Sequence, residues 1–502
     1  MSSQTRTNSL KFPNKFYWGT ATAAFQIEGH PEEALGKLSD WSEWIEREDK
    51  VKKPTNDGRA VNHYEQMIED VDLIRGMNNN AYRFSFNWAR LHRGPGEFDE
   101  NAAKFYDTLL DQLLQDKAGL AHKARIEAFA TIVHFAIPTW LAKAGGWENS
   151  NTANEFQKFT EFLVKRYGDR IKNWVTHNEP NIFLGFGYES GIWPPGYSND
   201  WNRYFKAYQG LLLGHQLAYK TIKEHNPQAQ VGFAQNLYAY ESKDESLHEK
   251  KWQSANAMPN ALRKQLHNYA FIESCIEMDT LDFLGVNYYT RFSYKLNPKA
   301  KDNADPNVDS SFWGELDPYP ESEANSLGWE IYPEGLYKVL TDKKLTRMLE
   351  GRPIYITENG YSKVEADQLD IEDNYRIKFI RDHLIAVHRA INEGANVQGY
   401  FHWSLLDNFE WALGMKPRFG LVHVDHNSFV RTKKKSYDYY GAIALNNGIA
   451  LTEKPMVDPY MASDPSPTNI GSPFSLNPAN APLELQTESS TPGSIIEFFR
   501  NP

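Results

Sequence analysis

Glu358 stands where a short apolar segment meets a turn. The segment, residues 353–357, is rich in β-branched and aromatic side chains, which predicts a buried strand. Asn359 and Gly360 follow the glutamate and predict a turn. In an α/β barrel the C-terminal ends of the strands form the rim where chemistry takes place. A glutamate at a strand end, taken alone, is more often a solvated or loop-capping residue, so a catalytic interpretation of Glu358 needs a partner.

Glu179 is that partner. It ends a second β-branched and aromatic run, residues 173–178, and precedes Pro180, which disfavours helical geometry at the glutamate. Two glutamates on strand ends of one barrel can face each other across a pocket. Paired carboxylates are what cleavage of a glycosidic bond requires: one protonates the leaving oxygen, and the other attacks or screens the sugar cation.

The elements that must position the two glutamates are visible as alternating apolar and amphipathic segments. This alternation predicts a parallel sheet covered by helices. The expected strands are residues 16–22, 80–86, 129–134, 173–178, 231–234, 283–288, 353–357 and 397–405. Apolar residues at helical spacing predict covering helices over 64–74, 105–113 and 377–391, among others. The fold class is therefore α/β: a single (β/α)8 TIM barrel with long active-site loops.

The barrel is expected to occupy residues 1–450, and the composition changes after it. Residues 451–502 are rich in Pro and Ser and cannot build a core, so they should form an irregular tail that is docked or disordered. The polar stretch 294–327 is expected to form a loop over the mouth of the barrel, and residues 115–125 are expected to form a surface insertion.

Composition excludes several classes of function. The chain has 502 residues and a formal net charge of −11, without a basic stripe, which argues against nucleic acid as a partner. No apolar N-terminal segment predicts a signal peptide or a membrane span, and there is one cysteine, Cys275, and no glycosylation sequon. We therefore expect a cytoplasmic location. No phosphate-binding loop or metal-ligand spacing is present, so no cofactor and no metal are expected, while a homo-oligomer stays open.

Five motifs together resemble glycoside hydrolase family 1, a family of β-glycosidases, and most of all its β-glucosidases. They are residues 16–29, 176–180, 356–360, 408–411 and 418–421. The motifs occur in the family's order, and the resemblance covers nearly all of residues 12–445. It implies a retaining enzyme that hydrolyses terminal β-D-glucosyl residues of β-glucosides and short β-linked oligosaccharides. The partner would thus be a small-molecule β-glycoside, and β-galactosidase and transglycosylation activities stay open.

The resemblance also implies roles for individual residues near the two glutamates. Glu358 would be the nucleophile and Glu179 the acid and base, with carboxyl groups about 5 to 5.5 Å apart. The charge on Glu358 is expected to raise the pKa of Glu179 and keep it protonated. Arg83 would pair with Glu358 and favour its ionised form, and Tyr289 would donate its hydroxyl to the same carboxylate.

Further residues are expected to bind the substrate. By resemblance, five polar side chains would bind hydroxyl groups of the sugar: Gln26, His134, Asn178, Asn287 and Glu410. Trp411 would assist them, Trp403 would form a stacking platform, and Trp329 would line the leaving-group side.

Two features bear on the choice of sugar. Phe135 stands where most family members have tryptophan, so an indole N–H donor near the sugar is missing. Trp411 is retained, whereas members that act on 6-phosphorylated sugars carry a smaller residue there, so an unphosphorylated sugar is favoured. The basic run 431–435 could serve a phosphate, but as a charge run it is interpreted as a solvated surface segment. The alternative to an enzyme is a barrel that binds sugar without hydrolysing it. The presence of both glutamates argues against this alternative.

Overall fold

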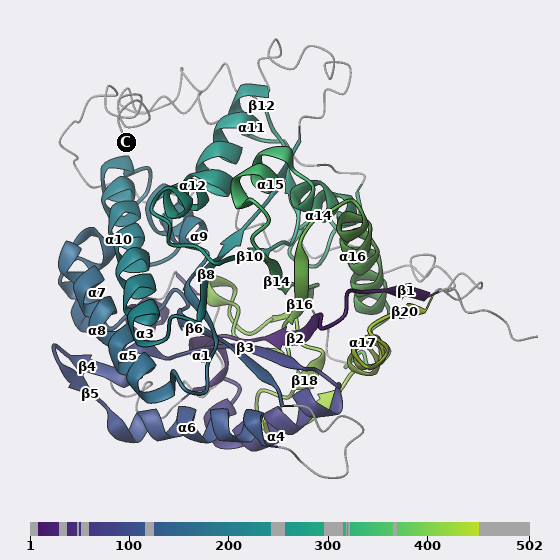
Figure 1. Cartoon of the computed structure of the whole chain (residues 1–502), viewed down its shortest axis with the longest axis horizontal. Helices are drawn as coiled ribbons and strands as arrows, with labels where there is room; N and C mark the ends of the chain where they lie inside the picture. Colours follow the sequence, from purple (N-terminus) through teal and green to yellow (C-terminus); the bar gives the residue numbers. More distant parts are fainter. Residues whose placement is uncertain are drawn as a thin grey trace, which may run out of the picture.

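The computed structural model describes residues 9–29, 38–47, 50–51, 60–115, 125–241, 257–295, 315–317, 319, 322–364 and 369–450. Eight parallel strands form a closed barrel at its centre, and helices surround them (Figure 1). The prediction of a (β/α)8 barrel is thus confirmed. The expected tail at 451–502 and most of the two expected insertions at 115–125 and 294–327 lie outside the described residues.

The barrel strands fall where the sequence places them, within a few residues at each end. In chain order they are β2 (Tyr17–Ala21), β3 (Ala81–Ser85), β6 (Glu127–Val133), β7 (Asn173–Asn178), β8 (Gln230–Asn236), β10 (Phe283–Asn287), β14 (Ile354–Asn359) and β16 (Val397–Trp403). Neighbours along the chain are hydrogen-bonded, and β16 pairs with β2 to close the barrel. The fifth strand, β8, extends two residues beyond the predicted end and so includes Asn236.

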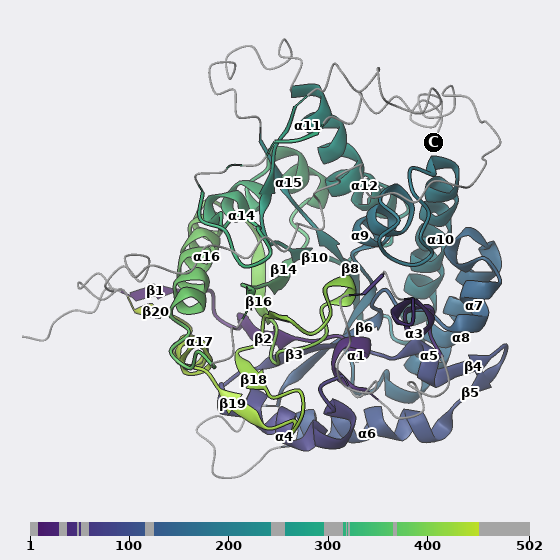
Figure 2. The same cartoon turned by 180° about the vertical axis from the view of Figure 1, so that it is seen from behind.

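Amphipathic helices cover the outside of the barrel, as their apolar spacing predicts. The main ones are α4 (His63–Gly76), α6 (Glu100–Leu114), α8 (Ser150–Tyr167), α10 (Trp201–His225), α12 (Ala270–Glu277), α14 (Pro333–Leu340), α15 (Lys343–Leu349), α16 (Asn374–Asn392) and α17 (Lys435–Asn446). Seen from behind, the same helices enclose the strands (Figure 2). Cys275 lies on α12 and is a fully buried core residue.

Aromatic rings fill the interior of the barrel below the strand ends. The ring of Phe129 lies 4.7 Å from that of Phe401, 5.0 Å from Tyr355 and 6.3 Å from Phe283, centroid to centroid. These side chains come from four different strands, and three of the four are fully buried. The barrel is therefore packed rather than hollow, and it holds the strand ends in fixed positions.

The strand register is irregular at the C-terminal ends of the two strands that lead to the glutamates. The pairing of β7 with β8 shifts between Val175 and Asn178, and the pairing of β14 with β16 shifts between Ile356 and Asn359. Such shifts bend a strand locally and change the direction of its side chains, and they are common beside active sites. The two glutamates thus lie where the regular pairing of the strands is interrupted.

The first and last described strands pair with each other. β1 (Ser9–Lys11) and β20 (Gly448–Ala450) form a small antiparallel sheet beside α16 and α17 (Figure 1). None of the helices in the described part of the chain is long and apolar enough to cross a membrane.

Candidate active site

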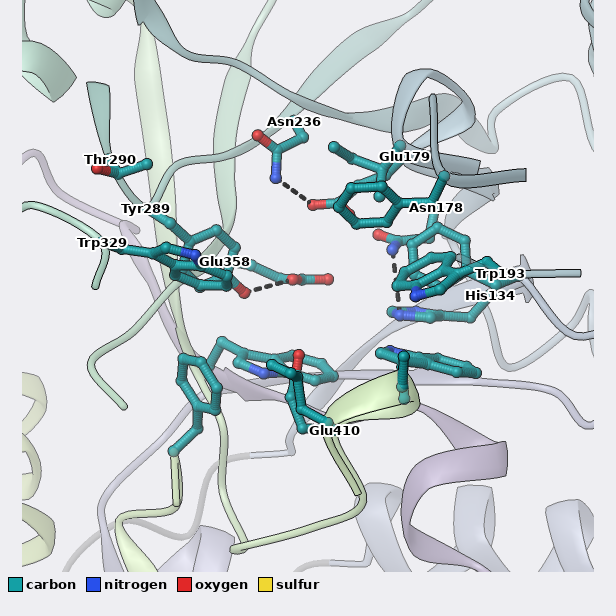
Figure 3. A pocket seen from close by; sticks show the side chains of 18 of the residues that line it. His134, Asn178, Glu179, Trp193, Asn236, Tyr289, Thr290, Trp329, Glu358 and Glu410 are labelled. Carbon is teal, nitrogen blue, oxygen red and sulfur yellow. Dashed lines mark hydrogen bonds between the residues drawn. The ribbon is translucent and has the colours of Figure 1, made fainter. Parts of the chain in front are cut away.

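Both glutamates are buried at the C-terminal rim of the barrel. Glu358 is the fifth residue of β14 and is 3% exposed, and Glu179 directly follows β7 and is 6% exposed. Glu179 adopts a left-handed backbone conformation with φ of 46°, consistent with the expectation that Pro180 excludes a right-handed helical one there. Figure 3 shows the two carboxylates pointing into one pocket from different sides.

Glu358 is held by a cation and a hydroxyl group. The Nη1 atom of Arg83 lies 2.6 Å from Oε1 of Glu358, and the hydroxyl of Tyr289 donates to Oε2 at 2.7 Å. Burial raises the pKa of Glu358, while the Arg83 guanidinium and the Tyr289 hydroxyl act in the opposite direction. Arg83 therefore favours the ionised form, as expected, but its effect is smaller than that of burial.

Glu179 is held by two amides and contacts no cation among the residues that the structure describes. The side chains of Asn236 and Asn287 each donate to Oε1 of Glu179 at 2.8 Å. No described residue bonds Oε2, which leaves that oxygen for a proton. Burial, and after it the charge of Glu358, raises the pKa of Glu179 to about 8. The sequence prediction that the pKa is raised agrees with this, but burial and not Glu358 is the main cause.

Asn178 connects the two glutamates. Its Oδ1 atom accepts hydrogen bonds from Arg83 Nη2 at 2.6 Å and from Asn287 at 3.1 Å, and its amide nitrogen lies 3.1 Å from Nε2 of His134. Arg83 thus reaches Glu358 with one nitrogen and Asn178 with another. A single buried network therefore fixes the nucleophile candidate relative to the acid candidate.

Glu410 adds a third carboxylate to the pocket. It follows β16 in the loop before the short helix η5 (Trp411–Leu413). Burial and the charges of Glu358 and Glu179 raise its pKa to about 8. Gln26 lies behind it: its amide donates to the Phe409 carbonyl at 2.7 Å and lies 3.5 Å from Oε2 of Glu410.

Aromatic rings form a wall beside these polar groups. The indoles of Trp403 and Trp411 lie nearly parallel to the His134 ring, at 5.8 and 6.1 Å between centroids. Gly360, which follows β14, is needed for this arrangement, because a Cβ atom there would lie 1.8 Å from the carbonyl oxygen of Trp403. The turn after the nucleophile strand can therefore contact Trp403 only if residue 360 is glycine.

The pocket has about 740 Å³ of empty space, counted out to its open mouth. Nine of the sequence-predicted residues line it: His134, Asn178, Glu179, Tyr289, Trp329, Glu358, Trp403, Glu410 and Trp411. The other three, Gln26, Arg83 and Asn287, do not line it. They lie behind it and bond to residues that do.

Some residues of the site were not predicted from the sequence. Asn236 bonds Glu179, and it could have been found as a polar residue at the end of a strand had β8 been predicted at full length. Ile182, Phe186, Trp193 and Tyr238 also line the pocket. Ile182 and Phe186 follow Glu179 at helical spacing, which was the available signal.

The interpretation of residues 431–435 as a solvated segment is wrong for two of its members. The Lys434 side chain is fully buried, with Nζ 3.2 Å from both carboxylate oxygens of Asp407. The side chain of Arg431 is buried as well and donates to both carboxylate oxygens of Asp70 at 2.9 Å. Each basic side chain is stabilised by a buried acid, and Asp407 also accepts from the backbone N–H of Gly420. Lys434 and Asp407 thereby support the loop that carries Glu410.

Comparison with known proteins agrees with this geometry. The model of glycosyl hydrolase family 1 matches residues 8–276 and 258–449. Beta-glucosidase A of Thermotoga maritima is 34% identical over 466 residues, which cover 88% of this chain and 99% of the relative. The aryl-phospho-beta-D-glucosidase BglC of Bacillus subtilis is 32% identical over 487 residues, covering 88% and 98%. The solved structure of the family 1 b-glucosidase from Thermotoga maritima superposes with a TM-score of 0.78 at 32% identity, covering 88% of this chain and all of that one.

Proposed function

This chain belongs to glycosyl hydrolase family 1, and we propose that it is a retaining β-glucosidase that releases terminal glucosyl residues from β-glucosides. The observation that carries the proposal is the unequal pair of glutamates in one pocket. Glu358 has a guanidinium in contact, whereas Glu179 has two amides and a pKa of about 8. Environments that differ in this way assign one carboxylate to nucleophilic attack and the other to proton transfer.

In the first step, a carboxylate oxygen of Glu358 attacks the anomeric carbon of the bound sugar. The bond from that carbon to the leaving oxygen breaks, and the proton of Glu179 moves to the departing oxygen, which leaves as an alcohol. The sugar is now an ester of Glu358, and Glu179 is ionised. This step requires Glu179 to hold its proton near neutral pH, which its raised pKa supports.

In the second step, water replaces the sugar ester. Glu179 removes a proton from the water as its oxygen attacks the anomeric carbon, and Glu358 leaves as a carboxylate. Arg83 and Tyr289 stabilise the negative charge that returns to Glu358. Two successive inversions retain the β configuration of the sugar, and the cycle ends with both glutamates in their starting protonation states.

The sugar ring would lie among Trp403, His134, Asn178 and Glu410. The indole of Trp403 offers a flat apolar surface, and the other three side chains offer donors and acceptors to hydroxyl groups. Glu410 bears no contact with a cation in the described residues, so hydroxyl donors of the sugar would meet an acceptor that lacks strong competitors. Hydrogen bonds to hydroxyl groups convert binding into orientation of the anomeric carbon toward Glu358.

An unphosphorylated sugar is favoured over a 6-phosphorylated one. No lysine or arginine is among the described residues that line the pocket. Arg431 and Lys434, the basic residues that could have served a phosphate, are bonded to Asp70 and Asp407. A phosphate group carries about two negative charges near neutral pH, so it would be buried here without a compensating cation from the described residues. We therefore expect this chain to act on an unphosphorylated sugar, although one relative is named a phospho-glucosidase.

The experiment that tests the proposed function measures nitrophenol release from nitrophenyl β-glucoside and β-galactoside. Wild type should hydrolyse the glucoside, and Glu358→Ala should lose nearly all turnover. Azide added to the Glu358→Ala variant should restore nitrophenol release and yield the α-glycosyl azide, because azide then attacks from the side that the carboxylate occupied. The ratio of the two wild-type rates ranks glucose against galactose. Absence of wild-type turnover on both sugars contradicts the proposal.

A further inference from the structure

Tyr289, which donates its hydroxyl group to Glu358, follows a residue whose backbone is tied to β14 by both of its polar groups. The N–H of Tyr288 donates to the carbonyl oxygen of Glu358 at 3.0 Å. The carbonyl oxygen of Tyr288 accepts from the side-chain amide of Asn359 at 2.6 Å. That carbonyl belongs to the planar peptide unit that joins Tyr288 to Tyr289. Asn359 therefore fixes the backbone from which the Tyr289 side chain projects.

The side chain of Asn359 is itself held by a hydroxyl group. Tyr400 on β16 donates to Oδ1 of Asn359 at 2.8 Å, and both residues are fully buried. A carbonyl oxygen can only accept, so the amide nitrogen of Asn359 faces Tyr288 and its oxygen faces Tyr400. The pairing of β14 with β16 is irregular between Ile356 and Asn359, and the Tyr400 hydrogen bond connects the two strands there. It also favours the amide orientation that bonds the Tyr288 carbonyl.

These contacts close a ring of covalent and hydrogen bonds around the nucleophile candidate. Glu358 is followed by Asn359, whose amide bonds the Tyr288 carbonyl. Tyr288 is followed by Tyr289, whose hydroxyl donates back to Oε2 of Glu358 at 2.7 Å, the bond drawn in Figure 3. A displacement of the Asn359 side chain is therefore transmitted through one peptide unit to the Tyr289 hydroxyl.

We propose that Asn359 and Tyr400 are positioning residues for the nucleophile, which hold the Tyr289 hydroxyl on Glu358. This inference rests on the proposed β-glucosidase function and adds two residues to the support of its nucleophile. Neither residue is among those that line the pocket, so each acts through Tyr289 and not on the sugar. The Tyr289 bond serves both proposed steps, because it favours the ionised nucleophile before attack and stabilises the carboxylate that leaves afterwards.

The first test is Tyr400→Phe, which removes one hydroxyl group and keeps the ring. Oδ1 of Asn359 then lacks this buried donor, so the amide loses its fixed orientation and the bond from Tyr289 to Glu358 weakens. We expect kcat/KM for nitrophenyl β-glucoside to fall roughly tenfold. The acid limb of the pH profile should move to higher pH, because a weaker Tyr289 hydrogen bond raises the pKa of Glu358.

A double-mutant cycle with Tyr289→Phe separates positioning from a general structural effect. In the Tyr289→Phe background the hydroxyl that Tyr400 positions is already absent. Adding Tyr400→Phe there should leave kcat/KM and the acid limb nearly unchanged. An equal fall of kcat/KM in both backgrounds would overturn the inference.

Asn359→Leu tests the second residue, because leucine has the branching of asparagine without its polar atoms. This variant should lower kcat/KM at least as far as Tyr400→Phe does, and its effect should likewise disappear in the Tyr289→Phe background. It leaves the Tyr400 hydroxyl and the Tyr288 carbonyl without their buried partner. If Asn359→Leu does not fold, the Tyr400→Phe cycle alone decides.

The matched control is Tyr167→Phe on α8. It also removes a buried tyrosine hydroxyl, which donates to the Ala103 carbonyl at 2.8 Å, away from the pocket. This variant should keep the wild-type kcat/KM and pH profile.

Failure of the positioning role can be told from failure of the proposed function. If wild type hydrolyses no β-glucoside, the proposed function is contradicted, and the positioning role with it. If wild type hydrolyses nitrophenyl β-glucoside and Tyr400→Phe has the same kcat/KM and the same acid limb, the proposed function stands and only the positioning role is overturned.

Discussion

The Nη1 atom of Arg83 lies 2.6 Å from Oε1 of Glu358, and both side chains are nearly fully buried. The same guanidinium bonds Asn178, the residue before Glu179, through Nη2. Arg83 therefore places a positive charge beside Glu358, the nucleophile candidate. It also fixes the end of β7, the strand that Glu179, the acid candidate, directly follows. Because the pair is buried, removing the cation leaves an uncompensated carboxylate in a medium that solvates it poorly.

Arg83→Met should lower kcat/KM by about 100-fold or more, since a charge-assisted bond to each of two partners is lost. The pKa of Glu358 should rise further, so less of it is ionised at acidic pH and the acid limb of the pH profile moves to higher pH. A pH series of kcat/KM on an aryl glucoside measures both effects. Arg93→Met, which breaks the partly buried pair with Asp99, is the matched control and should change neither. An acid limb that stays in place would refute the role given to Arg83.

The alkaline limb of the pH profile should reflect Glu179. Its pKa is raised to about 8 by burial and by Glu358, and the acid form is the one that protonates the leaving oxygen. Hence kcat/KM should fall as pH rises through about 8. The pKa of Glu410 is also raised to about 8, so the two must be separated. With a nitrophenyl glucoside the limb should persist in Glu410→Gln. Glu179→Gln is measured with a dinitrophenyl glucoside, whose leaving group needs no proton, and it should retain activity without an alkaline limb. The opposite pattern would assign the limb to Glu410.

Glu179→Gln should also make the protein more stable toward heat, increasingly so at high pH. A carboxyl whose pKa is raised by folding stabilises the folded state fully below its unfolded pKa, and this stabilisation is lost as pH rises through the folded pKa. For Glu179 the window runs from about 4.5 to about 8. The Tm difference between variant and wild type should therefore be small at pH 4.5, grow across that window and level off above it. Calorimetry at pH 5, 7 and 9 measures it. A difference that shrinks with pH would contradict the raised pKa.

A phosphate on the 6-position of the sugar should abolish efficient turnover. No described lysine or arginine lines the pocket, so the phosphate would be buried there without a cation from these residues. We therefore expect kcat/KM for a nitrophenyl 6-phospho-β-glucoside to be at least about 100-fold below that for the unphosphorylated glucoside. The comparison needs only wild-type protein and the two substrates. Preference for the phosphorylated sugar would show that a basic group outside the described residues reaches the pocket.

Local sequence patterns predict the barrel strands and the positions of the two glutamates at strand ends, because each strand signal lies within a few neighbouring residues. The β-branched runs before Glu179 and Glu358 and the turn residues after them need no knowledge of the rest of the chain. Arg83 could be paired with Glu358 by a further argument, since an arginine in so apolar a strand requires a buried partner.

Features that depend on distant contacts were not predictable in this way. The burial of Lys434 follows from Asp407, which lies 27 residues earlier in the sequence. Trp193 reaches the pocket from a loop with no periodic pattern, and its contacts with Phe186 and Phe135 are set by how that loop folds. Burial raises the pKa of Glu179 more than the charge of Glu358 does. This order could not be predicted from the sequence, because desolvation depends on the whole surrounding structure and not on one neighbour.

The central claim is that Glu358 forms a covalent bond with the sugar. The most direct measurement is mass spectrometry of the protein treated with dinitrophenyl 2-deoxy-2-fluoro-β-glucoside. The fluorine slows both steps of the reaction, while the dinitrophenyl group keeps the first step fast enough for the ester to accumulate. The account predicts one added fluoroglucosyl group on the peptide that contains Glu358, and no addition in Glu358→Gln. An adduct on any other residue, or wild-type turnover of ordinary glucosides without any adduct, would contradict it.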